Sequence, residues 1–452
     1  MVVFLALYVL AQIGLAAWAA RGTSDEKDYL IAGRSLGLWQ IAFSVFATWF
    51  AAETVIATSA EVANDGLAGA RVEPIGYSLG LVALGLLVAF RLRKGGYVTL
   101  ASFLGSRFGP QVEVAAAVFT AMGSTVWAAA QLSALAVILA SATGAPLGLM
   151  LLVSTGIVTL YAWVGGLKGD VVTDMLQGGV IIVVLLIMLG LVFQFAGGVG
   201  PAFAAIPEGA LAFQIPGEGW LARAELWALP ILGTIVSQEV IARSLGASSP
   251  QTARNGTLLG AALFLTVGMI PVVLGLIGPG LDLNLSEGDQ FFTSFSEAVL
   301  PPWLYVVMSG AMISAILSSV DSALLSVSAV ATENGWGRLK PQTTGTERLV
   351  VARVAAAGAA VAALLVALAG DSIRAIVLTG EGVTGLLVLP LLCGLLLKDG
   401  GRLAVLAALA VSFVLTWLLD WSMGVPGAFL YALAGGGAAL VLTLMVERAL
   451  KR

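Results

Sequence analysis

Five acidic residues interrupt the long apolar stretches of this sequence, and they are its most informative candidates for chemistry. An ionised carboxylate in hydrocarbon costs on the order of 2.5–3.5 kcal/mol, so each one is expected to have a functional reason. Arg243, one helical turn after the third of them, is the only basic residue at a comparable depth. The five acids are Glu53, Asp174, Glu239, Asp321 and Glu381.

Hydroxyl side chains surround one of these acids in the run 318–322 (SSVDS), where four of five consecutive side chains carry oxygen. Ser318, Asp321 and Ser322 share a helix face because their spacings are three and four residues. A single serine in a helix often donates to its own backbone. A dense cluster beside an unpaired carboxylate instead favours a hard cation such as sodium, which takes oxygen ligands from hydroxyl, carboxylate and free carbonyl groups.

The sequence contains no histidine, and this excludes several classes of chemistry. A proton relay through imidazole, a histidine-ligated metal centre and a Ser-His-Asp hydrolase are all ruled out. No phosphate-binding glycine loop of the P-loop type occurs, so transport would use an ion gradient rather than ATP. We therefore predict that the chain is not an enzyme. Sodium coupling is the simpler account, and carboxylate-based proton coupling stays open.

These side chains are embedded in a strongly apolar chain of 452 residues, of which 59% are hydrophobic and 11% charged, with a mean hydropathy of +1.00. Soluble domains have roughly 25% charged residues. A bilayer crossing takes ~20 apolar residues, and thirteen runs of about that length occur. We predict an all-α integral membrane protein in which residues 1–452 form a single polytopic membrane domain. The runs cover residues 2–20, 36–61, 70–92, 111–141, 146–167, 171–196, 224–245, 256–279, 301–332, 348–369, 373–396, 402–419 and 425–446.

The distribution of basic residues predicts the orientation of the chain. If all thirteen runs cross, all but three of the 22 Lys and Arg residues fall on one side, the exceptions being Arg71, Arg223 and Arg374. The positive-inside rule then places the N terminus outside and the C terminus in the cytoplasm, in the plasma membrane or bacterial inner membrane. No loop is long enough for a soluble domain, so the expected partners are the lipid bilayer and a small solute, without nucleic acid. We expect a monomer or a weak oligomer.

Five motifs occur in order along this frame. They are 28–37 (DYLIAGRSLG), 51–54 (AAET), 165–168 (GGLK) followed by 173–177 (TDMLQ), 237–238 (SQ) with 242–243 (AR), and 315–319 (AILSS). Together they resemble the sodium/solute symporter family, which contains bacterial proline, sialic acid and galactose symporters and the mammalian sodium/glucose transporters. The likeness covers nearly the whole chain.

The resemblance implies a leucine-transporter-like fold with a five-plus-five inverted repeat. Residues 36–196 would form the first repeat and 224–396 the second, with 1–20 and 402–446 as peripheral helices. Discontinuous helices near the midplane would expose carbonyl groups and helix ends to the ion and the solute. The run 47–54 contains no Gly or Pro, so composition gives no sign of the break that the family has there.

The resemblance also implies Na+ as the coupling ion. Its common site would use three backbone carbonyls and two hydroxyls, those of Ala47, Phe50, Ala315, Ser318 and Ser319. A second site of some members would match Asp174, Ser318, Asp321 and Ser322, with Asp321 standing where those members have serine. The added carboxylate either strengthens a second cation site, replaces it by a proton-titrating pair, or serves another purpose, and a cation or proton role is favoured.

The implied solute site lies between the second, third, fourth, seventh and eleventh apolar runs. The solute is expected to be small and polar, such as an amino acid, a sugar, a sialic acid or an organic acid, and a zwitterion, a polyol or a cation is equally compatible. The family's proline symporters carry an acid where this chain has Trp49, so proline is not implied. The candidate residues are Glu53, Thr54, Tyr77, Trp127, Gln131, Trp227, Thr234 and Glu381.

The predicted function is a secondary active transporter that couples inward sodium flow to uptake of the solute by alternating access. Two alternatives remain open. A proton-coupled symporter of the same fold would take up solute along a pH gradient without sodium. A solute-sensing membrane receptor would bind the solute without translocating it.

Overall fold

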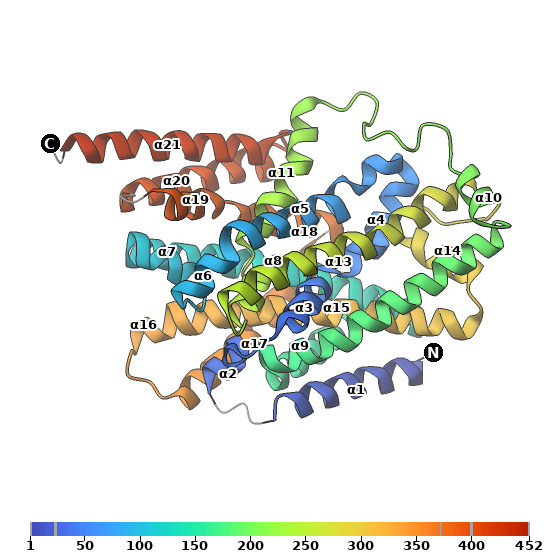
Figure 1. The fold of residues 1–452 in the computed structure, drawn as a ribbon, viewed down its shortest axis with the longest axis horizontal. Coiled ribbons are helices and arrows are strands. Elements are labelled where there is room, and N and C mark those ends of the chain that lie inside the picture. The colour runs from blue at the N-terminus through green and yellow to red at the C-terminus, as the bar shows by residue number, and fades with distance from the viewer. Residues whose placement is uncertain (1, 22–24, 371, 398–400, 451–452) are drawn as a thin grey trace.

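The computed structural model describes residues 2–21, 25–370, 372–397 and 401–450. Within these ranges the chain is built from helices and has no β-strand. Figure 1 shows most of the helices lying along one long axis, as expected for a bundle that crosses a bilayer. A helix satisfies its backbone N–H and C=O groups within its own segment, which hydrocarbon requires because it offers no hydrogen bonds. Three residues that the orientation prediction counts as cytoplasmic, Lys398, Lys451 and Arg452, lie outside the described ranges.

The helices follow one another with short 3₁₀ and π segments between several of them, including Gly66–Arg71 and Val72–Gly76. In chain order the α-helices are α1 (Val2–Ala19), α2 (Glu26–Ile31), α3 (Leu38–Trp49), α4 (Ala52–Asp65), α5 (Tyr77–Leu84), α6 (Phe90–Gly95), α7 (Leu100–Phe108), α8 (Pro110–Thr143), α9 (Leu147–Phe195), α10 (Val199–Ala204), α11 (Trp220–Val236), α12 (Gln238–Leu245), α13 (Pro250–Ile277), α14 (Phe291–Val299), α15 (Pro302–Val330), α16 (Gly337–Leu339), α17 (Gly345–Ala369), α18 (Ile373–Gly385), α19 (Val388–Leu396), α20 (Arg402–Thr416) and α21 (Ala428–Leu450).

Ten helices in the described part of the chain are long and apolar enough to cross a bilayer. Two of them, Glu53–Gly95 with 43 residues and Leu147–Phe195 with 49, are about twice as long as the ~20 residues of one crossing. The second is divided at Gly166, whose φ of 58° and ψ of 179° are not helical. The all-helical class is therefore confirmed, whereas the count of thirteen spans stays a prediction.

Two helices are interrupted in the middle of the bundle. The first interruption separates α3 from α4 at Phe50, with φ −80° and ψ 73°, and the second separates α11 from α12 at Ser237, with φ −64° and ψ 119°. Neither junction has a Gly or Pro at the break itself. One interruption falls in each predicted repeat, which is the arrangement that an inverted repeat with discontinuous helices requires.

The depth of burial differs strongly along the chain. In the most apolar stretch of Ile373–Leu396, 78% of the residues are buried, and in that of Pro302–Leu339, 72%. The corresponding value for Ala428–Ala449 is 17%. Helices α15 and α18 therefore form the interior, while α21 packs on α20 at the edge and faces outward over most of its surface.

The two ends of the bundle differ in charge. Figure 1 shows α6, α7 and α16 at one end and α10 and α14 at the other, with α1 beginning toward the second end and α21 finishing toward the first. Basic side chains such as Arg93, Arg107 and Arg338 lie at the first of these ends. Because the chain begins at one end and finishes at the other, the arrangement is compatible with an odd number of crossings.

One loop near the second end is held by ion pairs. The Arg71 guanidinium is buried and donates to the Glu218 carboxylate at 2.7 Å, and Arg223 donates to the same oxygen at 3.2 Å. The hydrogen bond from Arg71 lowers the pKa of Glu218 below its ordinary value. The contribution of this pair to stability is therefore present above the ordinary pKa and is lost as the pH falls through the lowered one.

Glycine allows α13 to approach α3 closely. An added Cβ at Gly256 would lie 2.6 Å from the Cβ of Ile41, and one at Gly260 would lie 2.8 Å from the Cβ of Val45. Helix association within a bilayer depends on such packing, because lipid tails are as apolar as the helix surfaces. The spacing of α3 from α13 thus depends on these two positions.

We expect Gly260→Ala to lower thermal stability, because overpacking of this kind typically costs ~1–3 kcal/mol. Thermal unfolding of the purified protein in detergent measures the effect. Gly179→Ala on α9 is the matched control, since an added methyl group there meets no atom within 4 Å. Equal melting temperatures for the two variants would contradict the close approach.

Candidate functional site

The interruption between α3 and α4 frees backbone carbonyl groups at the centre of the bundle. In a continuous helix the Ala51 N–H would bond to the carbonyl of Ala47, but here it donates to the carbonyl of Trp49 at 2.9 Å. Thr54 closes the other side of the break, with its hydroxyl donating to the same Trp49 carbonyl at 3.2 Å. Carbonyl groups freed in this way need a partner, because an unsatisfied polar group in an apolar interior is costly.

Helix α15 faces this break with its hydroxyl groups. Ser319 Oγ donates to the carbonyl of Thr48 at 2.9 Å and to that of Ala315, on its own helix, at 3.0 Å. Ser318 Oγ donates to Asp174 on α9. The structure therefore brings the two segments of the predicted sodium site together, and all five predicted ligand residues, Ala47, Phe50, Ala315, Ser318 and Ser319, are buried.

Asp174 connects α9 to both segments. One carboxylate oxygen accepts from Ser318, and the other accepts from Ser44 Oγ of α3 at 2.5 Å. Ser44 had no place in the sequence prediction, although it lies one turn before Thr48 on the same helix face. The acid therefore sits at the junction of α3, α9 and α15, where the resemblance places a second cation site.

A buried arginine lies directly beside this junction, and it is the basic residue that the sequence places at the depth of the acids. Arg243 of α12 is fully buried, forms an ion pair with Asp170 and has its Nη2 3.9 Å from Asp174 Oδ2. It reaches Glu239 only through the backbone carbonyl, at 3.2 Å. The arginine turns toward α9 because two buried carboxylates there offer a better partner for its charge.

Asp170 is a functional candidate that the sequence reading missed. It is fully buried, although it follows the 165–168 motif and was taken as part of a connection between spans. The signal that would have found it is its position four residues before Asp174, which puts both acids on one face of a helix. The helix of α9 begins again at once after Gly166, so no loop separates them.

Asp321 remains without a hydrogen-bond donor in the part of the chain that the structure describes. Both of its carboxylate oxygens are buried and accept no hydrogen bond. Of the other residues in the predicted second site, Ser322 donates to the Ser318 carbonyl at 2.7 Å and also receives a hydrogen bond from Arg243. Three carboxyl groups, those of Asp170, Asp174 and Asp321, thus share a buried site with one guanidinium, and Asp321 is the one of the three for which the described chain provides no hydrogen bond or ion pair.

A second cluster lies on the other side of the break, around Trp49. The centre of its ring system is 5.3 Å from that of Trp127 and 5.9 Å from that of Tyr77, and its Nε1 donates to Thr234 Oγ1 at 3.2 Å. Glu53 accepts hydrogen bonds from Trp127 Nε1 at 3.1 Å and from Gln131 Nε2 at 2.7 Å. Five of the predicted solute residues therefore gather around a tryptophan that was not on the predicted set.

Two small cavities flank these aromatic rings. The first has a volume of about 20 Å³ and is lined by Glu53, Glu73, Tyr77, Glu61 and Arg374 among others. The second, of about 10 Å³, is lined by Trp49, Trp127, Ser124, Glu239 and Glu381 among others. The aromatic group of Trp49, Tyr77 and Trp127, called here the aromatic trio, therefore lies between two acidic cavities.

The acids of these cavities outnumber the bases. Glu73 lies in the segment Val72–Gly76, and its side chain is buried. One carboxylate oxygen of Glu73 and one of Glu381 have no hydrogen-bond partner in the described part of the chain. Arg374 lines the first cavity and is ion-paired with Glu61. Among the described residues, no Lys or Arg lines the second.

Thr54 and Trp227, which were also predicted to contact the solute, line neither of the two small cavities. Thr54 closes the helix break rather than facing a cavity. Trp227 is half-buried on α11, and its indole makes no hydrogen bond to any described residue. Glu239 takes a more central place than predicted, because it lines the second cavity and accepts from Ser237 Oγ at 2.6 Å and from Ser124.

The sequence comparison decides the family. A model of the sodium:solute symporter family matches residues 29–397. The chain belongs to the sodium:solute symporter family. The resemblance read from the five motifs is thereby confirmed, as is the prediction that the chain is not an enzyme, since the family's members are transporters.

Relatives in this family differ in the solute that they carry. The high-affinity choline transporter 1 of Caenorhabditis elegans is 25% identical over 90% of this chain and 75% of its own length. That of Homo sapiens is 29% identical over 74% of this chain and 60% of its own length. The osmoregulated proline transporter OpuE of Bacillus subtilis is 24% identical over 82% of this chain and 78% of its own length.

Solved structures confirm the leucine-transporter-like fold. A Na+-coupled sialic acid symporter in a substrate-bound outward-open state superposes with a TM-score of 0.82 at 18% identity, over 97% of this chain and 95% of that one. Mhp1, a nucleobase-cation-symport-1 family transporter in a closed conformation, superposes with a TM-score of 0.60 at 16% identity, over 92% and 95%. At these identities the likeness concerns the fold alone.

We expect Arg243→Gln to destabilise the protein strongly, because removing one partner of a buried ion pair typically costs ~3–5 kcal/mol. Asp170→Asn in the same chain should restore part of the loss, since it removes the carboxylate that the first change leaves unpaired. Melting temperatures of the two single variants and the double variant measure the coupling. Strictly additive losses would show that the pair is not a stabilising unit.

Proposed function

We propose that this chain couples inward sodium flow to the uptake of a small organic cation by alternating access. The observation that carries the choice of solute is the aromatic trio with Glu53 beside it. Ring faces attract a cation, and the attraction reaches ~2 kcal/mol or more where water is excluded. Glu53, Glu73, Glu239 and Glu381 add negative charge on both sides of the rings.

This charge pattern ranks the solutes that the sequence left open. An organic acid or a sialic acid would meet carboxylates without a free buried base, which costs energy. A sugar or an uncharged polyol would leave those carboxylates unmatched. The named relatives from Caenorhabditis elegans and Homo sapiens are choline transporters, and choline carries a quaternary ammonium group. A compact cation of that kind is the solute class that we favour.

Sodium would bind between the break of α3 and α15. The carbonyls of Ala47, Phe50 and Ala315 and the hydroxyls of Ser318 and Ser319 would supply five oxygens, a donor set that suits a hard cation. Sodium binding would hold the backbone at the break in one conformation, and Trp49 and Glu53 flank that same break. The coupling would then rest on a reciprocal free energy, because the ion orders the backbone that positions the solute-binding side chains.

A second cation site at Asp174, Asp321 and Ser322 stays a prediction. The Arg243 guanidinium beside it already offsets the charge of Asp170, so a bound cation would offset one of the two further charges, those of Asp174 and Asp321. Uptake in a pH gradient without sodium would instead favour a proton-coupled symporter. Orientation with the N terminus outside and the C terminus in the cytoplasm of a plasma membrane, and a monomeric or weakly oligomeric state, belong to the same proposal.

We expect Ser318→Ala with Ser319→Ala to weaken binding of radioactive ²²Na+ to the purified protein by about tenfold or more, because two charge-stabilising hydroxyls are removed. Sodium-driven choline uptake into proteoliposomes should fall in parallel. Ser326→Ala is the matched control, since this buried hydroxyl of the same helix donates to the Ser322 carbonyl at 3.0 Å. Unaltered ²²Na+ binding in the double variant would reject the site.

We expect choline, in the presence of sodium, to raise the melting temperature of the protein more than its neutral isostere 3,3-dimethyl-1-butanol does. Trp127→Ala should weaken choline binding by about tenfold, as the loss of a desolvated cation–π contact predicts. Trp163→Ala is the control, because that indole is exposed on α9. Equal stabilisation by the neutral isostere, proline, glucose or acetate would overturn the choice of a cation. Binding without uptake into proteoliposomes would favour the receptor alternative.

A further inference from the structure

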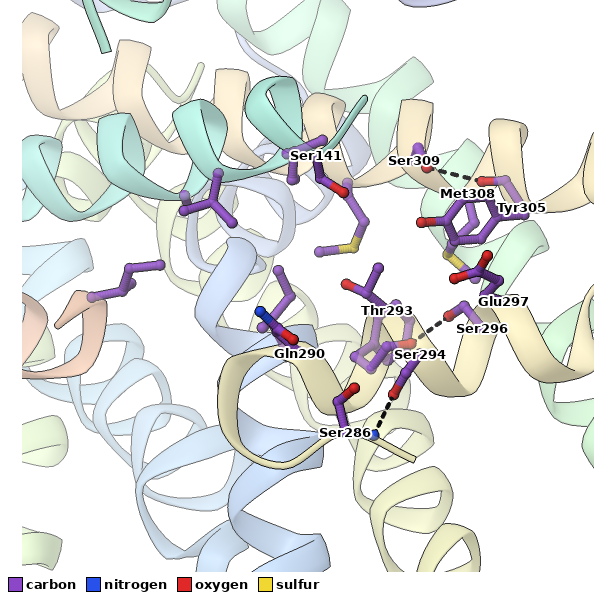
Figure 2. A pocket seen from close by; sticks show the side chains of 17 residues that line it. Ser141, Ser286, Gln290, Thr293, Ser294, Ser296, Glu297, Tyr305, Met308 and Ser309 are labelled. Atoms are coloured by element: carbon purple, nitrogen blue, oxygen red, sulfur yellow. Dashed lines mark hydrogen bonds between the residues drawn. The ribbon is translucent and has the colours of Figure 1, made fainter. Parts of the chain in front are cut away.

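A larger cavity lies apart from the aromatic trio, at the end of the bundle where α8 finishes and α15 begins. Its volume is about 510 Å³, which falls within the roughly 300–1,000 Å³ typical of small-molecule sites. Figure 2 shows α14 on one side of it and α8 and α15 on the other. Ile56 of α4 and Ile373 of α18 also line it, so five elements that are distant in sequence enclose one space.

Polar side chains with unused hydrogen-bonding capacity converge on this cavity. Figure 2 shows the oxygens of Ser141, Thr293 and Tyr305 turned toward the space between the helices. These three side chains, with Gln290 and Glu297, make no hydrogen bond or ion pair to another residue in the described ranges. By contrast, Ser309 and Ser294 are used locally, since each donates to a carbonyl of its own helix at 3.0 Å.

The remaining wall is apolar, and the net charge of the lining is negative. Met308 and Met312 of α15 and Val137 and Ile138 of α8 contribute apolar surface to the lining. Glu297 is the one charged residue in the lining, and no Lys or Arg among the described residues contributes to it. An anion would be repelled and a sugar would leave the apolar wall unused. A compact cation with hydrocarbon groups matches both parts of the lining.

We propose that this cavity is an outer binding site for a small organic cation, separate from the site at the aromatic trio. The inference rests on the proposed function in one respect, because the ligand is of the same chemical class as the proposed solute. The cavity adjoins both the predicted sodium site and the first small cavity. Met308 and Met312 also border a narrow gap with Phe50 and Ala315, and Ile373 precedes Arg374 of the first small cavity.

The position explains what such a site would do. A cation held here lies beside α4 and α18, whose Glu61 and Arg374 form the ion pair over the first small cavity. The site would raise the local concentration of the solute at that point, as electrostatic focusing by a charged, low-dielectric cleft does. It would also occupy space between α14 and α15 without requiring any change at the aromatic trio.

The test uses the single cysteine of the chain. Cys393, which is buried, is the one cysteine of the sequence. Replacing it in a Cys393→Ala background therefore leaves an introduced cysteine as the one reactive thiol. Thr293→Cys places that thiol in the cavity, and the full chain is reconstituted in nanodiscs. We compare its modification rates by a trimethylammonium methanethiosulfonate and by a sulfonate methanethiosulfonate. Glu297→Gln should lower the cation-to-anion rate ratio by about threefold to tenfold, whereas Asp282→Asn, an exposed acid outside the lining, should leave it unchanged.

Protection by a ligand then tests binding directly. Choline should slow the modification of the Thr293→Cys thiol, and 3,3-dimethyl-1-butanol should not. Glu297→Gln should remove the protection, while Trp127→Ala should keep it, because the aromatic trio is a different site. Each of four results would overturn the inference. They are a rate ratio that Glu297→Gln does not change, protection by the neutral isostere, a thiol that neither reagent modifies, and loss of protection in Trp127→Ala.

The two proposals can fail separately. Protection that persists in a chain without sodium-driven choline uptake would leave the outer site standing and reject the proposed function. Uptake that depends on Trp127 and Glu53, with no protection at the introduced thiol, would leave the proposed function standing and reject the outer site. The same preparations serve both measurements.

Discussion

The contact between the interrupted backbone at residues 49–51 and the hydroxyl face of α15 is the interaction on which the rest of the site depends. Carbonyl groups released by a helix break cannot turn to water in the centre of a membrane protein, so a neighbouring segment must satisfy them. Ser319 does so for Thr48, at 2.9 Å. Because Trp49 and Glu53 stand on either side of the same break, the groups that hold α3 against α15 also fix the aromatic trio. Ion and solute would thus share one stretch of backbone.

Two groups of buried charge flank this break, and they are compensated differently. Asp170 and Asp174 lie beside the guanidinium of Arg243, so much of their charge is neutralised within the protein. Glu53 instead relies on N–H donors from Trp127 and Gln131, and one oxygen of Glu381 has no donor in the described chain. A buried carboxylate that only neutral donors stabilise still attracts a cation. This contrast separates a structural ionic cluster from an acidic, aromatic region suited to a positively charged ligand.

The outer cavity and the aromatic trio would act in series. Both combine apolar surface with a carboxylate and lack a free basic side chain among the residues that line them. They differ in exposure, since Glu297 reaches solvent whereas Glu53 is buried. Water screens the outer charge, so that site would bind weakly and exchange quickly, and the inner one would discriminate. Along this proposed route the solute would lose water in steps.

The sequence by itself determined the membrane class and the family, because these depend on composition and on short motifs such as 315–319. The residues of the sodium site follow from the resemblance and stay a prediction. Through the family resemblance the sequence also implied Glu53, Trp127 and Gln131 as members of one solute site, and the structure brings these three side chains together. Composition gave no sign of the break near Phe50, because no Gly or Pro marks it. The resemblance implied it, and the tertiary contact with Ser319 satisfies the Thr48 carbonyl beside it. The pairing of Arg243 with Asp170 was also not readable, because the two become an ion pair only when α9 and α12 pack together. Glu73 and the cavity beside α14 were likewise decided by tertiary structure, because each depends on segments far apart in the chain that no local pattern relates.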